Sequence, residues 1–384
     1  MSVNINLPRI LRVGAGASDH LAPTLKHLGL SRPLLVTDPG LAALPMVEEA
    51  LDGCRHAGVA AGLFSKIKGN PNGQNVADGV TAFTSDDHDG VIAFGGGSAI
   101  DAAKAIALMA GQNRPLWDFT DINDNWMRAD AAAIAPIVAV PTTAGTGSEA
   151  GRAALITDED SHVKEIIFHP QILPARVILD PQLTRALPPA ITAATGMDAL
   201  SHNLEALCSP NYHPMAEGIA VEGIRLIKEY LPLAVADGND MTARMQMLVA
   251  SSMGATAFQK GLGAMHALAH PLGALYDAHH GLLNAILMPY VLQANREAIA
   301  GRVERVARYI GLSDPDFNGF LAWVLDLRKK IGIPHSLGSI GIDLQHQQLI
   351  GEMATADPTA ATNPVAFSAS QYSELFARAV TGDN

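Results

Sequence analysis

The sequence predicts an α/β N-terminal domain with a parallel sheet, followed by an all-α C-terminal domain. In the first half, short runs of apolar and β-branched residues alternate with helical patterns, which is typical of parallel strands joined by crossover helices. In the second half, long helical patterns follow one another without a convincing strand. A length of 384 residues is also more than one typical domain requires.

The strands are predicted at residues 33–38, 90–97, 135–143 and 175–181, and each run ends in turn residues or a polar loop. Long helices are predicted at 214–228, 241–258 and 281–295. The segment "LPPA" around Pro188 can end one element and begin a helix. We therefore predict two domains, 1–187 and 188–384, that pack around a shared cleft.

Composition excludes several classes of partner. Hydrophobic residues make up 48% and charged residues 17%, as in a compact globular enzyme. A net charge of -12, from 38 acidic and 26 basic residues, argues against nucleic acid or an anionic membrane as the main partner. The opening "MSVNINLPRILRVGAG" lacks a secretory signal, and no uninterrupted apolar run reaches about 18 residues. We expect a soluble cytoplasmic protein.

The two cysteines, Cys54 and Cys208, are too few for a disulfide framework in a chain of this length. Both lie in apolar helical patterns, which predicts buried thiols.

A glycine-rich turn follows the second predicted strand in "VIAFGGGSAIDAAKAIALMA". Gly95, Gly96 and Gly97 allow positive φ and close backbone approach. Ser98 is expected to cap the next helix, with Asp101 placed as in a capping box. Such a helix N-terminus offers N–H groups to a pyrophosphate. The turn is neither a GxGxxG nor a Walker motif, and a tight turn without a ligand is the alternative.

Two further strand ends carry polar groups. The loop "VPTTAGTGSEAG" contains Thr142, Thr143, Thr146 and Ser148, whose hydroxyls suit ribose or phosphate unless they bond only within the loop. Asp38 in "LLVTDPG" can accept hydrogen bonds from both ribose hydroxyls of NAD and would repel the 2′-phosphate of NADP. The alternative for Asp38 is an ordinary turn former.

Histidines gather in the helical half. Asp198 and His202 are four residues apart on an otherwise apolar helix, so they share one face. His266 and His270 repeat that spacing, and His280 follows. One carboxylate with several imidazoles suits Fe(II), Zn(II) or a similar ion. Each histidine alone fits a satisfied core residue, but that alternative has to explain five buried polar groups together.

Four motifs now occur in order: "GGGSAIDAAKAIAL", "PTTAGTGSE", "ATGMDALSHNLEA" and "GLGAMHALAHPLGALYDAHHGLLNAILMPYV". Together they resemble the iron-containing (group III) alcohol dehydrogenase family, over roughly Gly14 to Tyr290. The remaining C-terminal segment matches loosely.

The resemblance implies a Rossmann-like NAD-binding domain (1–187) and a helical metal-binding and substrate domain (188–384), the dehydroquinate synthase-like fold. A divalent metal, usually iron and sometimes zinc, would lie in the cleft between them. Matching the motifs implies these ligands: Asp198, His202, His266 and His280. His270 would be catalytic and aid proton transfer, with a structural role near Pro271 as the alternative.

The same matching implies which residues contact the dinucleotide: Asp38, Gly96, Gly97, Ser98, Thr142, Thr143 and Lys164. An acidic residue at the Asp38 position goes with NAD in this family, and a small one with NADP.

The predicted function is hydride transfer between NAD(H) and a small primary or secondary alcohol, aldehyde or ketone, with the metal as Lewis acid. We expect a homo-oligomer, a dimer or larger. One alternative is a reductase of an anionic semialdehyde or a hydroxy acid. The others are the related dehydroquinate synthase and glycerol dehydrogenase branch, which lacks this four-ligand spacing, and a catalytically silent nucleotide- or metal-binding protein.

Two places depart from the common family pattern. "AFQKGLG" carries Lys260, which we hypothesise lies near the pocket mouth and favours an anionic substrate tail; the alternative is a lysine that extends to solvent from a helix end. In "DAHHG" the family more often has a proline before the HG pair. His280 keeps the ligand position, and His279 is expected to be a bystander.

Overall fold

A computed structural model of the chain describes residues 7, 11–160 and 163–383; part of the opening segment therefore lies outside the described residues. Its internal contacts divide it into two compact units. The α/β unit comprises Leu7–Thr143 and Gly147–Arg185, and the helical unit comprises Ala144–Thr146 and Ala186–Asn384. The helical unit begins close to the boundary predicted at residue 188, and a short loop from the first half of the sequence groups with it.

The α/β unit is built on a six-stranded parallel sheet in the order β1-β8-β5-β4-β2-β3. Its strands are β1 (Leu11–Val13), β2 (Leu34–Val36), β3 (Gly62–Phe64), β4 (Val91–Gly95), β5 (Ile137–Pro141) and β8 (Arg176–Leu179). An antiparallel hairpin adds β6 (Ala153–Asp158) and β7 (Val163–Phe168). The four predicted strands are confirmed. The two edge strands were missed because three residues are too few to show a period, and the hairpin was missed as well.

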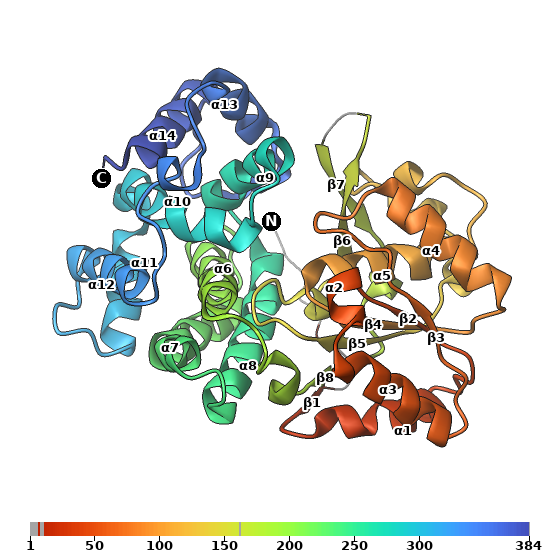
Figure 1. Cartoon of the computed structure of the whole chain (residues 1–384). Coiled ribbons are helices and arrows are strands. Elements are labelled where there is room, and N and C mark those ends of the chain that lie inside the picture. Colours follow the sequence, from red (N-terminus) through yellow and green to blue (C-terminus); the bar gives the residue numbers. More distant parts are fainter. Residues whose placement is uncertain (1–6, 8–10, 161–162, 384) are drawn as a thin grey trace. The chain divides into compact units, whose positions relative to one another are not determined.

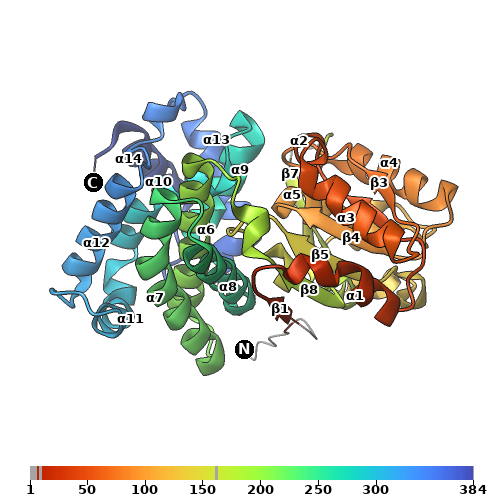
Figure 2. The ribbon, with the colours of Figure 1, turned by 60° about the horizontal axis from the view of Figure 1, so that its bottom comes forward.

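Helices cover both faces of this sheet (Figures 1 and 2). They are α1 (Leu21–His27), α2 (Pro39–Ala42), α3 (Pro45–His56), α4 (Gly73–Ser85) and α5 (Gly97–Met109). Helices α1 and α3 pack on the face that carries Leu35, Ile92 and Val138, because alternate strand residues point to one side. Helices α4 and α5 pack against each other and cover the opposite face, where α5 also meets the β6–β7 hairpin.

The strand order reverses between β2 and β4. The chain runs outward from β2 to β3 and then returns to place β4 on the other side of β2. In open α/β sheets ligands bind beyond the carboxyl ends of the strands at such a reversal. The residues that follow β2 and β4 here are Asp38 and the Gly95–Gly97 turn, so the topology selects two of the predicted nucleotide loops.

The helical unit consists of nine α-helices among its described residues. They are α6 (Pro189–Cys208), α7 (Pro214–Ala236), α8 (Met241–Ala257), α9 (Ala264–Tyr276), α10 (His280–Ala294), α11 (Arg296–Tyr309), α12 (Phe317–Lys330), α13 (Gln347–Ala356) and α14 (Ala369–Thr381). The predicted helices within 214–295 are confirmed, and the parallel sheet with a helical second unit confirms the predicted fold class.

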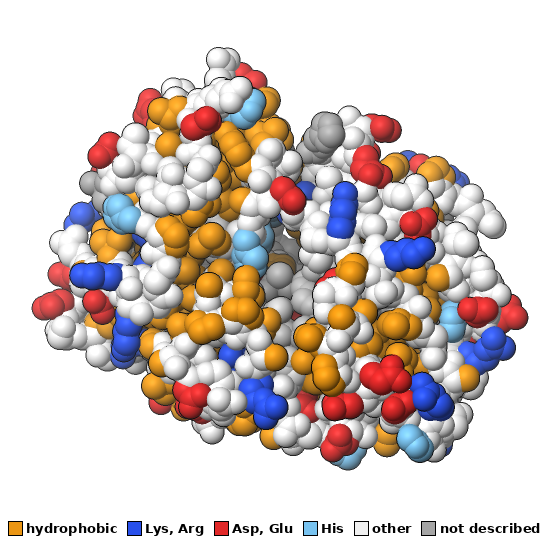
Figure 3. All heavy atoms as spheres, in the orientation of Figure 1, with side chains coloured by type: hydrophobic (Ala, Val, Ile, Leu, Met, Phe, Trp, Pro, Cys, Tyr) orange, Lys and Arg blue, Asp and Glu red, His pale blue; other side chains and the backbone are white. Residues whose placement is uncertain are grey.

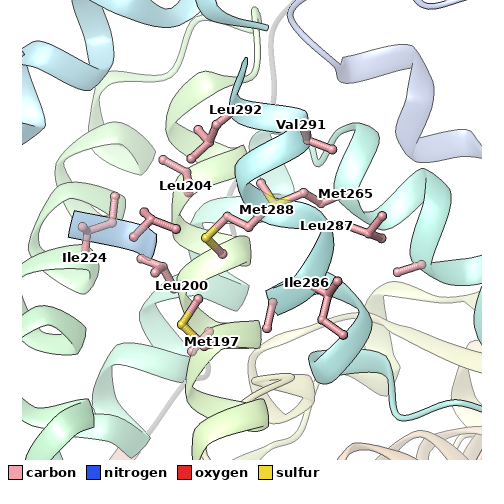
Figure 4. Packing of buried hydrophobic residues seen from close by; sticks show 14 of the residues in the cluster. Met197, Leu200, Leu204, Ile224, Met265, Ile286, Leu287, Met288, Val291 and Leu292 are labelled. Atoms are coloured by element: carbon pink, nitrogen blue, oxygen red, sulfur yellow. The ribbon is translucent and has the colours of Figure 1, made fainter. Parts of the chain in front are cut away.

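Helix α6 is the central element of this unit and packs against α7, α8 and α10 (Figures 1 and 2). All of its residues from Thr192 to Cys208 are buried, as expected for a helix that is apolar on every side. Figure 4 shows Met197, Leu200 and Leu204 of α6 packed among side chains of the neighbouring helices. Polar residues on α6 are therefore enclosed by a dense apolar core.

Charge on the visible surface is mixed. On the face drawn in Figure 3, acidic and basic side chains lie beside one another over the α/β unit. Arg55 of α3 illustrates this, with ion pairs to Glu48 at 3.8 Å and Asp52 at 2.6 Å. Among the described residues, none of the helices combines the length and apolar character needed to cross a membrane.

Both cysteines are buried free thiols, as predicted. Burial raises the pKa of Cys54 to about 11 and that of Cys208 to about 12, so neither is a reactive thiolate at neutral pH.

Candidate metal centre and nucleotide-binding loops

Helix α6 presents Asp198 and His202 on one face, one helical turn apart. Their side chains are 3% and 5% exposed, and Oδ1 of Asp198 lies 3.9 Å from Nε2 of His202. A buried carboxylate and a buried imidazole are costly unless partners satisfy them. The helix therefore places two polar groups in the core, and apolar packing alone does not explain their presence.

Helices α9 and α10 bring two more imidazoles to the same place. His266 is fully enclosed on α9, and His280 is the first residue of α10, with Nε2 3.7 Å from Oδ1 of Asp198. Gly281 permits this approach, because a Cβ there would lie 2.6 Å from the carbonyl oxygen of Ala194 on α6. The small residue beside His280 thus lets α10 begin directly against α6.

One ligand atom from each of four residues lies within 4.8 Å of all the others: Asp198, His202, His266 and His280. Two ligands of one tetrahedral ion are about 3.4 Å apart when each bond is about 2.1 Å. The measured separations of 3.7 and 3.9 Å require only small side-chain movements to reach that geometry. A carboxylate with three imidazoles is also a donor set that iron and zinc accept, so the residues present fit a divalent ion.

Glu205 orients the third imidazole. Its Oε2 lies 2.6 Å from Nδ1 of His266, and it accepts backbone hydrogen bonds from Gly263 (2.9 Å) and Met265 (2.7 Å) at the start of α9. Because Nδ1 donates to this carboxylate, Nε2 of His266 keeps its lone pair for a metal. Burial would lower the pKa of His266, but the neighbouring Glu205 carboxylate raises it overall.

Burial lowers the pKa of His202 to about 4, although the Asp198 carboxylate works in the opposite direction. His202 is therefore neutral at physiological pH. The neutral ring is the form that can coordinate a cation.

His270 lies beside these four residues but is not one of the group whose ligand atoms converge. Its ring stacks on His280 with centroids 5.5 Å apart and meets His266 edge-on at 5.9 Å. Its Nδ1 lies 2.7 Å from Oδ2 of Asp357. The alternative role for His270 was a hydrogen bond to a backbone carbonyl freed near Pro271. Its Nδ1 instead bonds to the carboxylate of Asp357, 87 residues later in the chain.

The carboxylate of Asp357 also decides which nitrogen of His270 carries the proton. Burial would raise the pKa of Asp357, but the bonds from His270 and Thr359 lower it overall. An ionised carboxylate can only accept, so Nδ1 of His270 donates and Nε2 is left with a lone pair.

In the α/β unit, the glycine turn after β4 has the expected form but a different cap. Gly95 has φ +150°, and a Cβ there would lie 2.7 Å from Cβ of Ala99, so this position requires glycine. Gly96 is the N-cap of α5 and no side chain caps the helix. The predicted cap by Ser98 with a capping box through Asp101 is therefore wrong, and the backbone N–H groups at this end stay open to a ligand.

Asp101 instead belongs to a buried network. It accepts a hydrogen bond from the Ser148 hydroxyl at 2.5 Å, and the ammonium of Lys104 donates to the same hydroxyl at 2.8 Å. Ser148 was predicted as a possible ribose or phosphate contact. Its hydroxyl is committed to this network, which ties the loop after β5 to α5.

Most of the other residues predicted to bind the nucleotide follow the carboxyl ends of strands β2, β4 and β5. Oδ1 of Asp38 accepts from the backbone of Leu41 at 2.9 Å and caps α2, so the turn-forming alternative is correct for one of its oxygens. A Cβ on Gly96 would lie 3.3 Å from Thr143, which places the loops after β4 and β5 side by side. Thr142 follows β5 directly, and its N–H bonds to the carbonyl of Gly95 at 3.0 Å.

Lys164 lies on β7, and its ammonium donates to Oδ1 of Asn70 at 2.6 Å. It therefore ties the hairpin to the segment before α4.

Lys260 has neither of the positions that the sequence predicted. It is 1% exposed, and its ammonium donates to the carbonyl oxygens of Ala206 (2.9 Å), Leu207 (3.3 Å) and Ser209 (2.8 Å). It also forms an ion pair with Glu217 at 3.3 Å. The hypothesis of a substrate-facing lysine is wrong, and so is the alternative of a solvent-facing one. Lys260 satisfies the carbonyl groups that every helix C-terminus leaves unpaired.

We expect Lys260→Met to lower the free energy of unfolding by about 3 kcal/mol, because three carbonyl groups and Glu217 lose their buried partner. Urea unfolding measures this, with the exposed Lys330→Met as control. The ratio of kcat/KM for anionic and neutral aldehydes should stay unchanged. A selective loss for the anionic substrate would contradict the structural role.

His279 is exposed and caps α10, with Nδ1 accepting from the backbone of Leu282 at 3.3 Å. Three polar residues of the site were missed by sequence reasoning: Glu205, Asp357 and Asn284. Glu205 had a usable signal, because it lies three residues after His202 on an apolar helix. Asp357 had none, since its loop carries no pattern that points to His270.

Comparisons with known proteins match most of the chain to one family. A family model described as "Iron-containing alcohol dehydrogenase" matches residues 8–181, and one described as "Fe-containing alcohol dehydrogenase family, C-terminal" matches residues 192–380. A 4-hydroxybutyrate dehydrogenase from Cupriavidus necator is 38% identical over 372 residues, which is 94% of this chain and 95% of the relative.

An NAD-dependent methanol dehydrogenase from Bacillus methanolicus is 34% identical over 94% of this chain and 95% of its own length. Among solved structures, a crystal structure of 1,3-propanediol oxidoreductase superimposes with a TM-score of 0.94 and 34% identity, covering 99% of this chain and 100% of that one. Each of these relatives therefore matches both the α/β unit and the helical unit of this chain.

Proposed function

This chain belongs to the iron-containing alcohol dehydrogenase family, and we propose that its metal is held by Asp198, His202, His266 and His280. It is an NAD-dependent oxidoreductase that interconverts alcohols with aldehydes or ketones and uses a divalent metal. The observation that carries the proposed site is the convergence of one carboxylate and three imidazoles within 4.8 Å in an apolar core.

A divalent ion in this site supplies Lewis-acid chemistry, lowering the pKa of an alcohol or polarising a carbonyl, while NAD(H) supplies or accepts the hydride. The chain's own contribution begins with presentation. Nε2 of His202 and Nε2 of His280 face Oδ1 of Asp198. Nε2 of His266 faces the side-chain amide of Asn284, which also contacts Asp198. The donor atoms therefore converge before any ligand binds. Glu205 restricts the rotation of His266. Asp198, His202 and His266 are buried, which strengthens electrostatic effects there, and His280 is 22% exposed.

We propose that His270 moves the proton released by the alcohol. Asp357 holds the Nδ1 proton of His270, which leaves Nε2 as the accepting atom. The stacking of this ring on His280 places it next to the ligand set. In the reverse direction the same nitrogen returns the proton to the product oxygen.

For the cofactor, we assign NAD to the domain at residues 1–187 and the metal and substrate to residues 188–384. Open N–H groups at the start of α5, the Gly95–Gly97 turn and the reversal of strand order between β2 and β4 support this assignment. The second carboxylate oxygen of Asp38 suits a ribose hydroxyl. Gly96, Gly97, Ser98, Thr142, Thr143 and Lys164 stay proposed contacts.

The substrate we propose is a small alcohol or its aldehyde. The relatives named above are, by name, a 4-hydroxybutyrate dehydrogenase, a methanol dehydrogenase and a 1,3-propanediol oxidoreductase. The first of these substrates is a hydroxy acid, and the other two are neutral alcohols. Lys260 was the residue-level reason for an anionic substrate, and its burial removes that reason. We also propose that the enzyme acts in the cytoplasm as a homo-oligomer.

The function is tested by NADH oxidation with a panel of aldehydes, including neutral ones and succinic semialdehyde, on protein whose metal content is measured alongside. We expect reduction of neutral aldehydes that depends on iron or zinc. Metal-replete protein that binds NADH but turns over no member of the panel would favour the catalytically silent alternative.

Two neighbouring histidines provide a matched test of the ligand assignment. We expect His280→Ala to lower the affinity for Zn(II) at least tenfold, because one of four donors is lost. His279→Ala should bind the metal normally and lose only about 1 kcal/mol of stability with the cap. Chelator competition measures the affinities. Loss of metal in His279→Ala alone would reverse the assignment.

Cofactor choice should depend on Asp38. We expect Asp38→Ser to raise the ratio of kcat/KM for NADPH over NADH at least tenfold, because the variant removes the repulsion of a 2′-phosphate and a charged acceptor for the ribose. Serine can still cap α2, so stability should change little. An unchanged ratio would place the ribose elsewhere.

A further inference from the structure

The side-chain amide of Asn284 lies among the four proposed ligands. Asn284 follows His280 by four residues on α10, so the two share a helix face, and it is 0% exposed. Its Nδ2 lies 2.9 Å from Oδ1 of Asp198, 3.2 Å from Nε2 of His266 and 3.2 Å from Nε2 of His280. One nitrogen thus contacts three of the four donor atoms.

The position of the Asn284 amide nitrogen is electrostatically favourable. A carboxylate oxygen and two imidazole nitrogens that converge on one point present lone pairs to one another, which is unfavourable in a buried site without a positive group. The amide nitrogen carries two N–H donors and can satisfy two of the three acceptors at a time. Oδ1 of Asn284 has no hydrogen-bond partner among the described residues, so the nitrogen alone accounts for the orientation of this amide.

We propose that Asn284 is a positioning residue of the metal centre, which holds Oδ1 of Asp198 toward the imidazoles of His266 and His280 and thereby raises the affinity for the ion. This inference rests on the proposed metal site. An amide nitrogen is a donor and does not coordinate a cation, so Asn284 acts through Asp198, as residues behind a ligating carboxylate do. Its contact with Oδ1 of Asp198 can persist when the ion binds, because a carboxylate oxygen has more than one lone pair. Each imidazole Nε2 has a single lone pair, so the contacts with His266 and His280 hold these rings in the metal-free protein and give way to the ion.

The first variant, Asn284→Leu, keeps a similar volume and removes both donors. We expect its affinity for Zn(II) and Co(II), measured by competition with a chelator, to fall 10- to 100-fold. Asn295→Leu is the matched control, because Asn295 is also a buried asparagine of this region but pairs with Asn363. Its metal affinity should match that of the unaltered protein.

The second variant, Asn284→Asp, keeps the shape and replaces the donor with a negative charge beside Asp198. The metal-free protein should melt at a lower temperature than the unaltered protein, since two carboxylates then face each other about 3 Å apart. Adding Zn(II) should raise its Tm by more than it raises that of the unaltered protein, because the cation offsets the repulsion. If residue 284 did not face the donor atoms, the Tm increase with Zn(II) would be the same in this variant as in the unaltered protein.

The outcomes separate the two claims. If the unaltered protein binds zinc stoichiometrically and Asn284→Leu binds it within about twofold, the role of Asn284 is overturned while the metal site stands. If the unaltered protein binds no divalent metal, the proposed site and this inference both fall. Should Asn284→Leu not fold, an Asn284→Asp variant whose Tm increase with zinc is no larger than that of the unaltered protein overturns the inference.

Discussion

Replacing Asp198 with alanine is expected to reduce kcat/KM for aldehyde reduction by NADH on the order of 10³-fold. Asp198 is the one anionic donor in the cluster, and its Oδ1 lies within 4 Å of His202 and His280. Lewis-acid stabilisation is worth several kcal/mol, and each 1.36 kcal/mol corresponds to a tenfold change in rate. Loss of about 4 kcal/mol gives the expected factor.

The measurement pairs steady-state kinetics with metal analysis of the same sample. Asp326→Ala is a suitable control, because Asp326 is exposed on α12 in the same unit. Thermal melts of both variants show whether the fold is retained. Full metal content in Asp198→Ala with kcat/KM within tenfold of the unaltered protein would remove Asp198 from the ligand set.

His270→Gln is expected to lower kcat by 10²- to 10⁴-fold, the range that a positioned general acid–base group contributes. The contact between Nδ1 of His270 and Asp357 at 2.7 Å leaves Nε2 as the atom that exchanges a proton, and glutamine cannot take that role. Metal content should be unchanged, because His270 is outside the four-ligand cluster. Kinetics on metal-replete protein measures the effect.

Asp357 provides the partner test. Asp357→Asn should lower kcat as well, because an amide that donates to Nδ1 shifts the proton of His270 to the wrong nitrogen. Asp357→Glu, which restores an acceptor, should recover part of the loss. If both histidine and aspartate variants lower Tm but leave kcat intact, the pair is structural and the proton takes another route.

Rules that depend only on neighbouring residues predicted several features of this protein. A spacing of four residues places Asp198 with His202 and His266 with His270 whatever the rest of the chain does, because helix geometry depends on neighbouring residues alone. Likewise, the strand-to-helix turn at Gly95 is dictated by a backbone conformation that a Cβ would obstruct. These patterns were sufficient for the fold class, the four predicted strands and the two residue pairs on α6 and α9, whereas the set of four ligands was implied by the family resemblance.

Local rules failed where a side chain bonds across a long sequence separation. The sequence suggested that Asp101 caps its own helix, yet it bonds to Ser148; it suggested that Lys260 faces substrate or solvent, yet three carbonyl groups at the end of α6 enclose it. In each case a local preference competes with distant polar groups, and burial decides in favour of the distant partner because unsatisfied polar groups are costly there.

By itself, the sequence determined which residue types reach one helix face and which loops follow the strands, since helical and strand periods are properties of adjacent residues. Only the tertiary structure decided that α6, α9 and α10 meet at Asp198, that Glu205 orients His266, and that Asp357 orients His270. The physical reason is that helix packing selects among many apolar surfaces of similar energy, and no single segment encodes which partner it will meet.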